Sequence, residues 1–550
     1  MLYEHPFEPG CFFLDANTKP PERLDRSCGL FSLNDQNFMR AIEWAPPIIN
    51  GEVKNLCNSP TFRRIPEWSF KVFLHPLRKY PGPILAALTE GYEAYYNVVK
   101  EGGLVAEIER LHDAYGPVVR VGPNTLHFKD EKAFHDIYTY GRTLIKEPQF
   151  YHGLMAHCEE SSIGFTDPEE AAKRRNLLGP LFSRRAVVAL EYTIQAKIDK
   201  LLTLLKENYS LPDLSLDISS AYLSLTLDII TSYCFGECTD ALDSPGFSHP
   251  FIRGMEAAKT RLWLIRHFPF FLSFTLRMPR KFVLWISPTF KGYLDLVGGL
   301  ERQVDSLLKN PESAYNVEHE TIYHHLLASV ASQDRPSRKS LLDEAFMLVG
   351  AGTGTSSNAC TVGTFYFLKN RVIRQNILLE LDEAWPDKDR PVNFVVLEKL
   401  PYLTAFIRET LRIAPGVIHP LPRMTSRKMA TVIGDWEVPP GTIVEMSVLS
   451  MHLDSDIFPD PHTFKPERWL TVADEDINKM LENLSPFSKG PRICLGLNLA
   501  WCELYLIFAN IFRKLDLTLL VTEDTIEDYS MDYVTPSWLV GGKDIGSLLI

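Results

Sequence analysis

The feature that most restricts this chain is a stretch of ten residues near its C-terminus, FSKGPRICLG at 487–496. In it, Cys494 stands two residues after Arg492 and two before Gly496, and the apolar helical pattern LGLNLAWCELYLIFANIFRKL follows at 495–515. A thiol at a helix N-terminus meets unpaired backbone N–H groups and the positive end of the helix dipole, and both favour the thiolate. The thiolate is the form that ligates metals, so the sequence predicts a metal-ligating cysteine at 494.

The remaining cysteines suggest neither a set of disulfides nor a second metal site. Nine cysteines are spread widely over 550 residues, which does not fit a set of disulfides. Cys234 and Cys238 form a close pair without a second pair or nearby histidines, so we interpret them as two buried thiols rather than a zinc site. The apolar content of 45% supports a large core, and the net charge of -12 argues against a nucleic-acid partner.

Helical periodicity dominates the chain after a polar, proline-rich start. Residues 1–67 are predicted to be a loosely structured extension, and 68–550 a single large domain. Apolar residues recur at helical spacing in 104–116, 190–209, 340–370, 401–415 and 495–515, while 116–128 and 428–449 carry strand patterns. The predicted fold class is mainly α with small β-sheets (α+β).

The sequence gives mixed signals about membranes. It opens with no apolar signal segment, and no run of ~18 uncharged apolar residues occurs. Residues 262–285 combine aromatic side chains with four basic ones, which is typical of a segment that lies at a membrane surface. A buried pair of helices broken at Pro269 explains the same residues, and the sequence does not decide between them.

Three further patterns are weak when each is taken alone. Glu409 and Arg412 share one face of a predicted helix, as many solvated pairs do. Arg468 follows Pro466 and Glu467 and has the planar fork that pairs with carboxylates. The stretch VGAGTGTSS at 349–357 places three glycines inside a helical pattern, which is costly unless a ligand approaches the backbone there.

The order of these patterns resembles one family. A glycine- and threonine-containing helix, Glu-x-x-Arg, Pro-Glu-Arg-Trp and Phe-x-x-Gly-x-Arg-x-Cys-x-Gly follow one another as in the cytochrome P450 haem-thiolate monooxygenases, from about Val72 to the C-terminus. The resemblance implies the cytochrome P450 fold and a haem b cofactor. It makes Cys494 the axial thiolate ligand of the iron.

The resemblance also assigns roles around the cofactor. Phe487 would pack beside the ligand loop, Gly490 and Gly496 would allow it to turn tightly, and Arg492 would pair with a haem propionate. Further propionate partners would be Arg423 and Arg175, although Ala171 stands where the family usually has an aromatic residue or histidine. Glu409, Arg412 and Arg468 would form a buried structural triad.

The predicted oxygen-activating residues depart from the family pattern. Thr355 and Ser356 are expected to be catalytic, but Gly354 occupies the position of the usual acid that helps to deliver protons. We therefore expect Thr355 and ordered water to carry the relay.

The implied function is insertion of one oxygen atom from O2 into a small lipophilic molecule, with electrons from NADPH through a separate cytochrome P450 reductase. The chain most resembles fungal members of secondary metabolism such as the trichodiene oxygenase group, so a terpenoid or polyketide substrate is expected. Two alternatives remain: an enzyme that uses peroxide or rearranges its substrate, which Gly354 favours, and a non-enzymatic haem-binding relative.

The expected location is the cytoplasmic side of the endoplasmic reticulum membrane. Microsomal relatives carry a membrane helix before a segment like FLHPLRKYPGP, and residues 1–67 are polar instead. The chain is then either unanchored, and possibly cytoplasmic, or does not begin at its native start.

Overall fold

The computed structural model describes residues 69–139, 144–154, 158–209, 215–259, 261–268, 270, 277–288, 290–310, 317–328, 335–470, 474–519, 526–533, 535–540 and 543–544. The predicted extension, 1–67, lies outside these residues.

Helices make up most of the described chain, as expected for the P450 fold. The longer ones are α6 (Leu104–Tyr115), α9 (Pro168–Leu178), α11 (Glu191–Asn208), α12 (Ile218–Phe235), α13 (Pro250–Lys259), α17 (Phe290–Lys309), α19 (Arg338–Lys369), α20 (Arg371–Ala384), α22 (Pro401–Ile413), α24 (Asp474–Asn483) and α25 (Leu497–Lys514). The shorter ones are α4 (Ile84–Leu88), α5 (Gly91–Ala94), α7 (Glu131–Tyr138), α8 (Pro148–Leu154), α10 (Arg184–Ala189), α14 (Leu262–His267), α16 (Arg280–Ile286), α18 (Ile322–Ala328), α21 (Phe394–Leu397) and α23 (Val448–His452). The five helical patterns of the sequence coincide with α6, α11, α19, α22 and α25.

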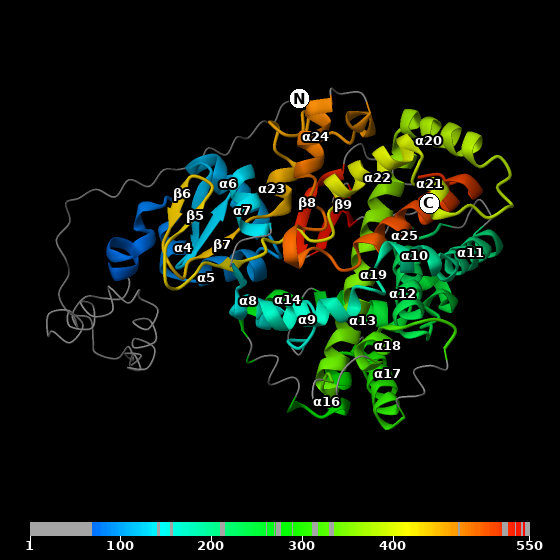
Figure 1. Ribbon diagram of the computed structural model, residues 1–550, viewed down its shortest axis with the longest axis horizontal. Helices are drawn as coiled ribbons and strands as arrows, with labels where there is room; N and C mark the ends of the chain where they lie inside the picture. Colours follow the sequence, from blue (N-terminus) through cyan, green and yellow to red (C-terminus); the bar gives the residue numbers. More distant parts are fainter. Residues whose placement is uncertain are drawn as a thin grey trace, which may run out of the picture. The chain divides into compact units, whose positions relative to one another are not determined.

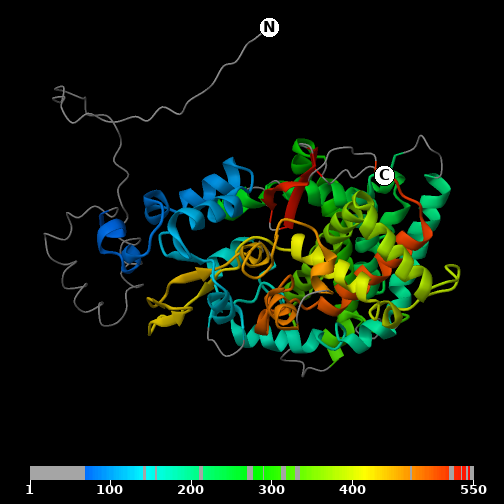
Figure 2. The ribbon, with the colours of Figure 1, turned by 90° about the horizontal axis from the view of Figure 1, so that it is seen from above.

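The strands form three small sheets. Their bounds are β1 (Val118–Gly122), β2 (Thr125–Phe128), β3 (Ile145–Lys146), β4 (Arg423–Met424), β5 (Thr431–Ile433), β6 (Trp436–Val438), β7 (Ile443–Glu445), β8 (Ile526–Tyr533), β9 (Thr535–Val540) and β10 (Lys543–Asp544). The largest sheet has the order β1-β2-β7-β4-β3, and β2 pairs with β7 in parallel, so segments some 300 residues apart lie side by side (Figures 1 and 2). Both predicted strand regions are confirmed, although the second ends in the first turn of α23.

The main core is built around α12, α19, α22 and α25. Phe365 of α19, Phe406 of α22 and Phe508 of α25 are fully buried, with the Phe406 and Phe508 rings 5.3 Å apart. Gly352 allows α19 to approach α12 closely, because a Cβ there would lie 2.6 Å from Cγ1 of Ile230. Close packing on this side fixes the position of α19, whose opposite face contributes to the candidate site.

Candidate active site

The loop before α25 turns at a position that only glycine fits. Gly490 has a φ of +69°, and a Cβ there would lie 2.2 Å from the backbone oxygen of Tyr138. The loop then folds back, so that the Cys494 N–H donates to the Phe487 oxygen at 2.9 Å. The Phe487 ring lies 6.3 Å from that of Trp501, on the apolar side of the loop.

Gly496 differs from its expected role in the turn. It is the N-cap of α25 with a φ of -84°, which any residue can adopt. A Cβ there would meet no atom within 4 Å, so the glycine leaves open space beside Cys494 instead of allowing a strained conformation.

The Cys494 side chain is accessible to solvent, although much protein surrounds its sulfur. Cys494 is exposed, whereas Cys158, Cys234, Cys360 and Cys502 are buried. Burial in the protein matrix raises the pKa of the Cys494 thiol, and this outweighs the backbone N–H of Gly496 and the charge of Arg175. The backbone N–H of Gly496 at the helix N-terminus thus favours the thiolate, as expected, but burial has the larger effect on the free thiol. A metal ion coordinated there would supply the missing positive charge, because it deprotonates a ligating thiol.

One face of α19 is bare where the glycines occur. Gly350, Ala351, Gly354 and Thr355 retain accessible surface in a helix that is otherwise largely buried, and added Cβ atoms at Gly350 and Gly354 would meet nothing within 4 Å. Spacings of one, four and five residues place them on one side of the helix. The helix continues without a break, so the glycines create a flat surface rather than a loosened turn.

Thr355 and Ser356, two of the predicted catalytic residues, have different surroundings. The Thr355 hydroxyl donates to the Ala351 oxygen at 2.8 Å and stays half-buried, with Gly416 packed against its side chain. Ser356 is buried and donates to Oε2 of Glu503 on α25 at 2.6 Å. Burial raises the pKa of Glu503 to about 7, and its Oε1 has no hydrogen-bond partner. Glu503 was not predicted from the sequence, because nothing distinguishes this glutamate from the other residues of the α25 pattern.

Glu409, Arg412 and Arg468 lie together in the interior. Oε1 of Glu409 is 2.8 Å from Nη2 of Arg412 and 3.0 Å from Nε of Arg468, and all three side chains are buried. Trp469 donates to Oε2 of the same carboxylate at 3.0 Å. The solvated-pair interpretation is therefore excluded by the burial of both partners.

Arg175, Arg423 and Arg492 lie near one another beside the cysteine loop. Each lowers the pKa of a buried fourth cation, Lys146, after the larger effect of burial itself. Arg175 donates to the Ile493 oxygen at 2.6 Å, and Arg423 donates to the Tyr151 hydroxyl at 2.8 Å. Lys146 was not predicted from the sequence, since a single lysine in a two-residue strand has no distinguishing pattern.

These residues fit a flat, iron-containing group with carboxylates. The set offers one accessible sulfur, a helix face with only small side chains, and buried or half-buried cations. Among the described residues, Nη1 of Arg492 is buried without a hydrogen-bond partner. A buried donor without an acceptor is rare in folded proteins, which supports an anionic ligand at this position.

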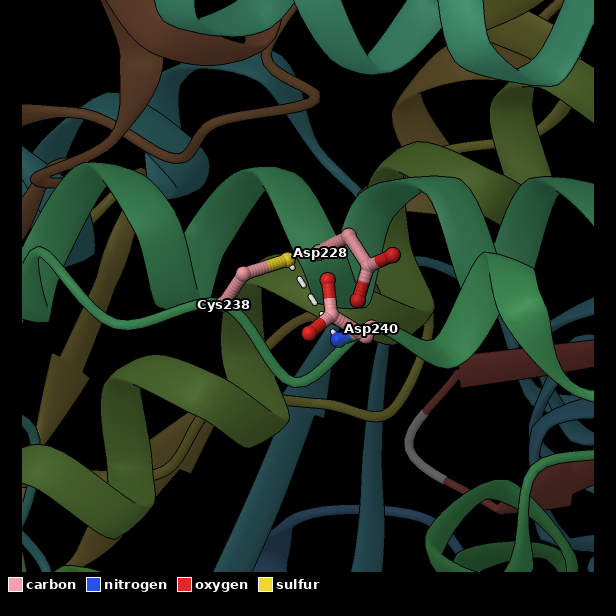
Figure 3. Close-up of side chains that lie close together, drawn as sticks. All are labelled: Asp228, Cys238 and Asp240. Carbon is pink, nitrogen blue, oxygen red and sulfur yellow. Dashed lines mark hydrogen bonds between the residues drawn. The ribbon is translucent and has the colours of Figure 1, made fainter.

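Cys238 is only half-buried, so the expected pair of buried thiols holds for Cys234 alone. Its sulfur lies with carboxylate oxygens of Asp228 and Asp240 inside a span of 4.8 Å (Figure 3). Asp228 already accepts from the backbone N–H groups of Ala241 at 2.7 Å and Leu242 at 3.1 Å. These bonds cap the turn after α12 and explain the cluster as a structural feature.

The aromatic-basic segment 262–285 divides into buried and exposed parts. Trp263 on α14 is 1% exposed and packs against His419, whereas Phe270 and Trp285 are 62% and 77% exposed. Trp263 therefore does not belong to the membrane-surface segment expected over 262–285, and 271–276 lie outside the described residues. Among the described helices, none combines the length and apolar character needed to cross a bilayer.

The helical fold with small sheets and the accessible Cys494 before α25 are those expected of an oxygenase of the P450 class, and comparison with known proteins agrees. The cytochrome P450 family model matches residues 94–537. The chain belongs to the cytochrome P450 family.

Its curated relatives are fungal enzymes that align over most of both chains. Cytochrome P450 monooxygenase tpcC of Cochliobolus heterostrophus is 34% identical, over 81% of this chain and 84% of the relative. Tryptophan 6-hydroxylase fscE of Fusarium equiseti is 33% identical, over 86% and 92%. N-acetyltryptophan 6-hydroxylase ivoC of Emericella nidulans is 30% identical, over 86% and 93%. The chain is thus a monooxygenase of the P450 family, which argues against the non-enzymatic alternative.

Proposed function

We propose that the chain binds haem b through Cys494 and inserts one oxygen atom from O2 into a small lipophilic substrate. The observation that carries this proposal is the accessible Cys494 sulfur in a loop whose turn only glycine fits. Haem held by a cysteine thiolate supplies the oxygen-activating chemistry, because the thiolate donates electron density that favours O–O cleavage.

The residues around the site then bind, orient and shield. Cys494 Sγ holds the iron, the Gly496 N–H points to the sulfur, and Phe487 limits the access of water. Arg175, Arg423 and Arg492 would bind the propionates, and the open space beside Gly350 and Gly354 on α19 would leave room for the ring. The triad of Glu409, Arg412 and Arg468 fixes the loops on the cysteine side of the ring.

Proton delivery is assigned to Thr355, with Gly354 and Ser356 in supporting positions. The Thr355 hydroxyl gives its hydrogen to the Ala351 oxygen, so its own oxygen is free to accept a hydrogen bond. Gly354 leaves room for ordered water where relatives place an acid. Ser356 ties the helix to Glu503, a buried carboxyl able to hold a proton near neutral pH.

Electrons are proposed to come from NADPH through a separate cytochrome P450 reductase. The working location is the cytoplasmic side of the endoplasmic reticulum membrane, with peripheral contact through exposed apolar side chains such as Phe270 and Trp285. A form that is free in the cytoplasm is the competing location.

The substrate is proposed to be a fungal secondary metabolite, a terpenoid or a polyketide. Two relatives are named for 6-hydroxylation of tryptophan and of N-acetyltryptophan, so indole derivatives belong in the same substrate screen.

The reduced, carbon-monoxide difference spectrum of the purified protein tests haem-thiolate binding. Substrates that shift the spin state are then incubated with NADPH and reductase, and separately with peroxide. Product with NADPH and reductase supports the proposal. Product with peroxide alone supports the second candidate, a peroxide-using or rearranging enzyme, which Gly354 favours.

A further inference from the structure

Lys146 and Arg423 face each other across two strands. In the antiparallel pair of β3 and β4, Lys146 is the direct register partner of Arg423. The two side chains are only 7% and 5% exposed. Like charges directly opposite each other on neighbouring strands are unfavourable, and burial strengthens the repulsion.

Among the described residues, Lys146 also has no carboxylate partner. Its Nζ donates to the Ile163 oxygen at 2.6 Å and lies 4.2 Å from the centre of the Tyr151 ring. The neighbouring carboxylate, Glu147, is turned to the start of α8, where it accepts from the backbone N–H groups of Gln149 and Phe150.

The two neighbouring cations, Arg423 and Arg492, also donate hydrogen bonds to neutral groups. Arg423 donates to the Tyr151 hydroxyl and to backbone oxygens of Leu421 and Pro422. Arg492 donates to the Phe165 oxygen at 2.9 Å, and its Nη1 is buried without a partner. Within the described parts of the chain, no carboxylate forms an ion pair with Lys146, Arg423 or Arg492.

Burial together with the nearby guanidinium groups holds the pKa of Lys146 well below its usual value. Lys146 and Arg423 are buried and Arg492 is half-buried, and all three have only neutral partners among the described residues. Such a set is expected where an anionic ligand completes the site, because isolated buried charges are otherwise unfavourable.

We infer that Lys146 is a propionate-binding residue, which supplies from β3 the hydrogen bond that Ala171 cannot donate from α9. This inference rests on the proposed binding of haem. Ala171 is 1% exposed and its methyl group has no donor, whereas the Lys146 ammonium lies among the arginines already assigned to the propionates. Lys146 is thus a positioning residue for the ring, and it does not touch the reacting atoms.

The first test uses haem and haem dimethyl ester, in which both carboxylates are esterified while the iron and the ring are unchanged. Loss of each from the purified, loaded protein to an excess of a haem acceptor is followed spectroscopically. A charge-assisted hydrogen bond corresponds to roughly ten-fold or more in affinity. Lys146→Met should therefore lose haem about ten-fold faster than wild type and lose the dimethyl ester at an unchanged rate. Lys146→Arg should stay close to wild type.

The matched control is Lys132→Met, which removes a lysine that is 63% exposed and pairs with Asp435. It should leave both rates unchanged. The inference is overturned if Lys146→Met leaves the haem rate unchanged, or if it accelerates the loss of haem and ester equally. Failure of wild type to bind haem at all would instead overturn the proposed function.

The unfolding midpoints of the haem-free and the loaded protein test the inference even if Lys146→Met folds poorly. Removing an uncompensated buried charge should raise the unfolding midpoint of the haem-free protein, while removing a propionate partner should lower that of the loaded protein. Lys146→Met is expected to have these opposite effects. A midpoint that falls in both forms means that Lys146 is merely structural.

Discussion

Nη2 of Arg412 lies 2.8 Å from Oε1 of Glu409, one turn earlier on α22, and neither side chain is accessible to solvent. The same carboxylate accepts from Arg468, from the backbone N–H of Lys465 and from Trp469. Arg412 further donates to backbone oxygens of His452, Pro461 and Thr463. Glu409 is therefore a buried negative charge that joins α22 to the segment before the cysteine loop.

Glu409→Gln should destabilise the protein by about 3–5 kcal/mol, because it leaves two buried guanidinium groups without their counter-charge. The free energy of unfolding is measured by denaturant titration. Glu170→Gln is the control, since Glu170 and its partner Lys173 are 54% and 69% exposed. It should cost less than about 1 kcal/mol. Similar losses in the two variants would contradict the buried triad.

Cys494→Ala should abolish the red-shifted band of the carbon-monoxide complex, because the other cysteines of the described chain are buried or half-buried elsewhere and cannot replace this ligand. Cys502→Ala should keep the band, since Cys502 is fully buried in the core on α25. The band is measured in absorbance spectra of the reduced proteins with carbon monoxide. An unchanged spectrum in Cys494→Ala would remove the basis of the haem assignment.

Thr355→Ala should continue to consume NADPH but form much less product, because positioned acid–base groups typically contribute about 10²–10⁴-fold to proton transfer. The readout is product formed per NADPH oxidised. Gly354→Asp should improve this ratio or leave it unchanged, unless the new side chain fills space used by the substrate.

Thr353→Ala is the matched control for this threonine. Thr353 makes the same type of bond, to the Val349 oxygen at 2.7 Å, but it is fully buried. Its removal should lower stability and leave the coupling ratio intact. If Thr355→Ala couples as well as wild type, the peroxide or rearrangement alternative gains support.

Acidification should lower the folding stability of the protein through protonation of His452. Burial and the charge of Arg412 lower the pKa of this histidine to about 3. Its Nδ1 bonds to the Arg412 oxygen and its Nε2 accepts from the Ser485 N–H, so both nitrogens are engaged in the neutral ring. A lowered folded-state pKa gives stability that is complete above about 6.5 and is lost as the pH falls towards the folded value.

The unfolding free energies of wild type and His452→Gln are compared between pH 7 and pH 4. The difference between them should shrink by about 1.4 kcal/mol per pH unit below 6.5. A difference that does not change with pH would show that His452 does not stay neutral in the folded state.

Phe270→Ser and Trp285→Ser should reduce binding to anionic vesicles, because both side chains are largely exposed beside basic residues. Co-sedimentation at low and high salt measures the effect. Tyr192→Ser is the control, since Tyr192 is 53% exposed on α11, far along the chain from this segment. If wild type does not bind anionic vesicles at any salt concentration, the proposed contact with a membrane surface is contradicted.

Much of the fold followed from local patterns. The apolar periods of α6, α11, α19, α22 and α25 appear in the sequence because each helix has one strip that must be buried. The cysteine loop could be located as well, since Gly490 is required by a positive φ and by the contact with Tyr138. Strand β3 could not be predicted from its two residues, because its existence depends on pairing with β4, almost 280 residues later.

The sequence alone therefore predicts the family and the mainly helical fold, which are confirmed, and a cysteine ligand at 494, because these depend on residue types at fixed short spacings. The tertiary structure decides which charges are buried together. The local spacing of Glu409 and Arg412 fitted a solvated pair, and the buried triad with Arg468 was expected only from the resemblance until the packing of α22 enclosed it. Lys146 had no significance before β3 was paired with β4. The accessibility of Trp285 and the burial of Trp263, 22 positions apart, were likewise settled by packing. Solvent access and long-range electrostatics depend on neighbours that are distant in the sequence, and no local pattern encodes them.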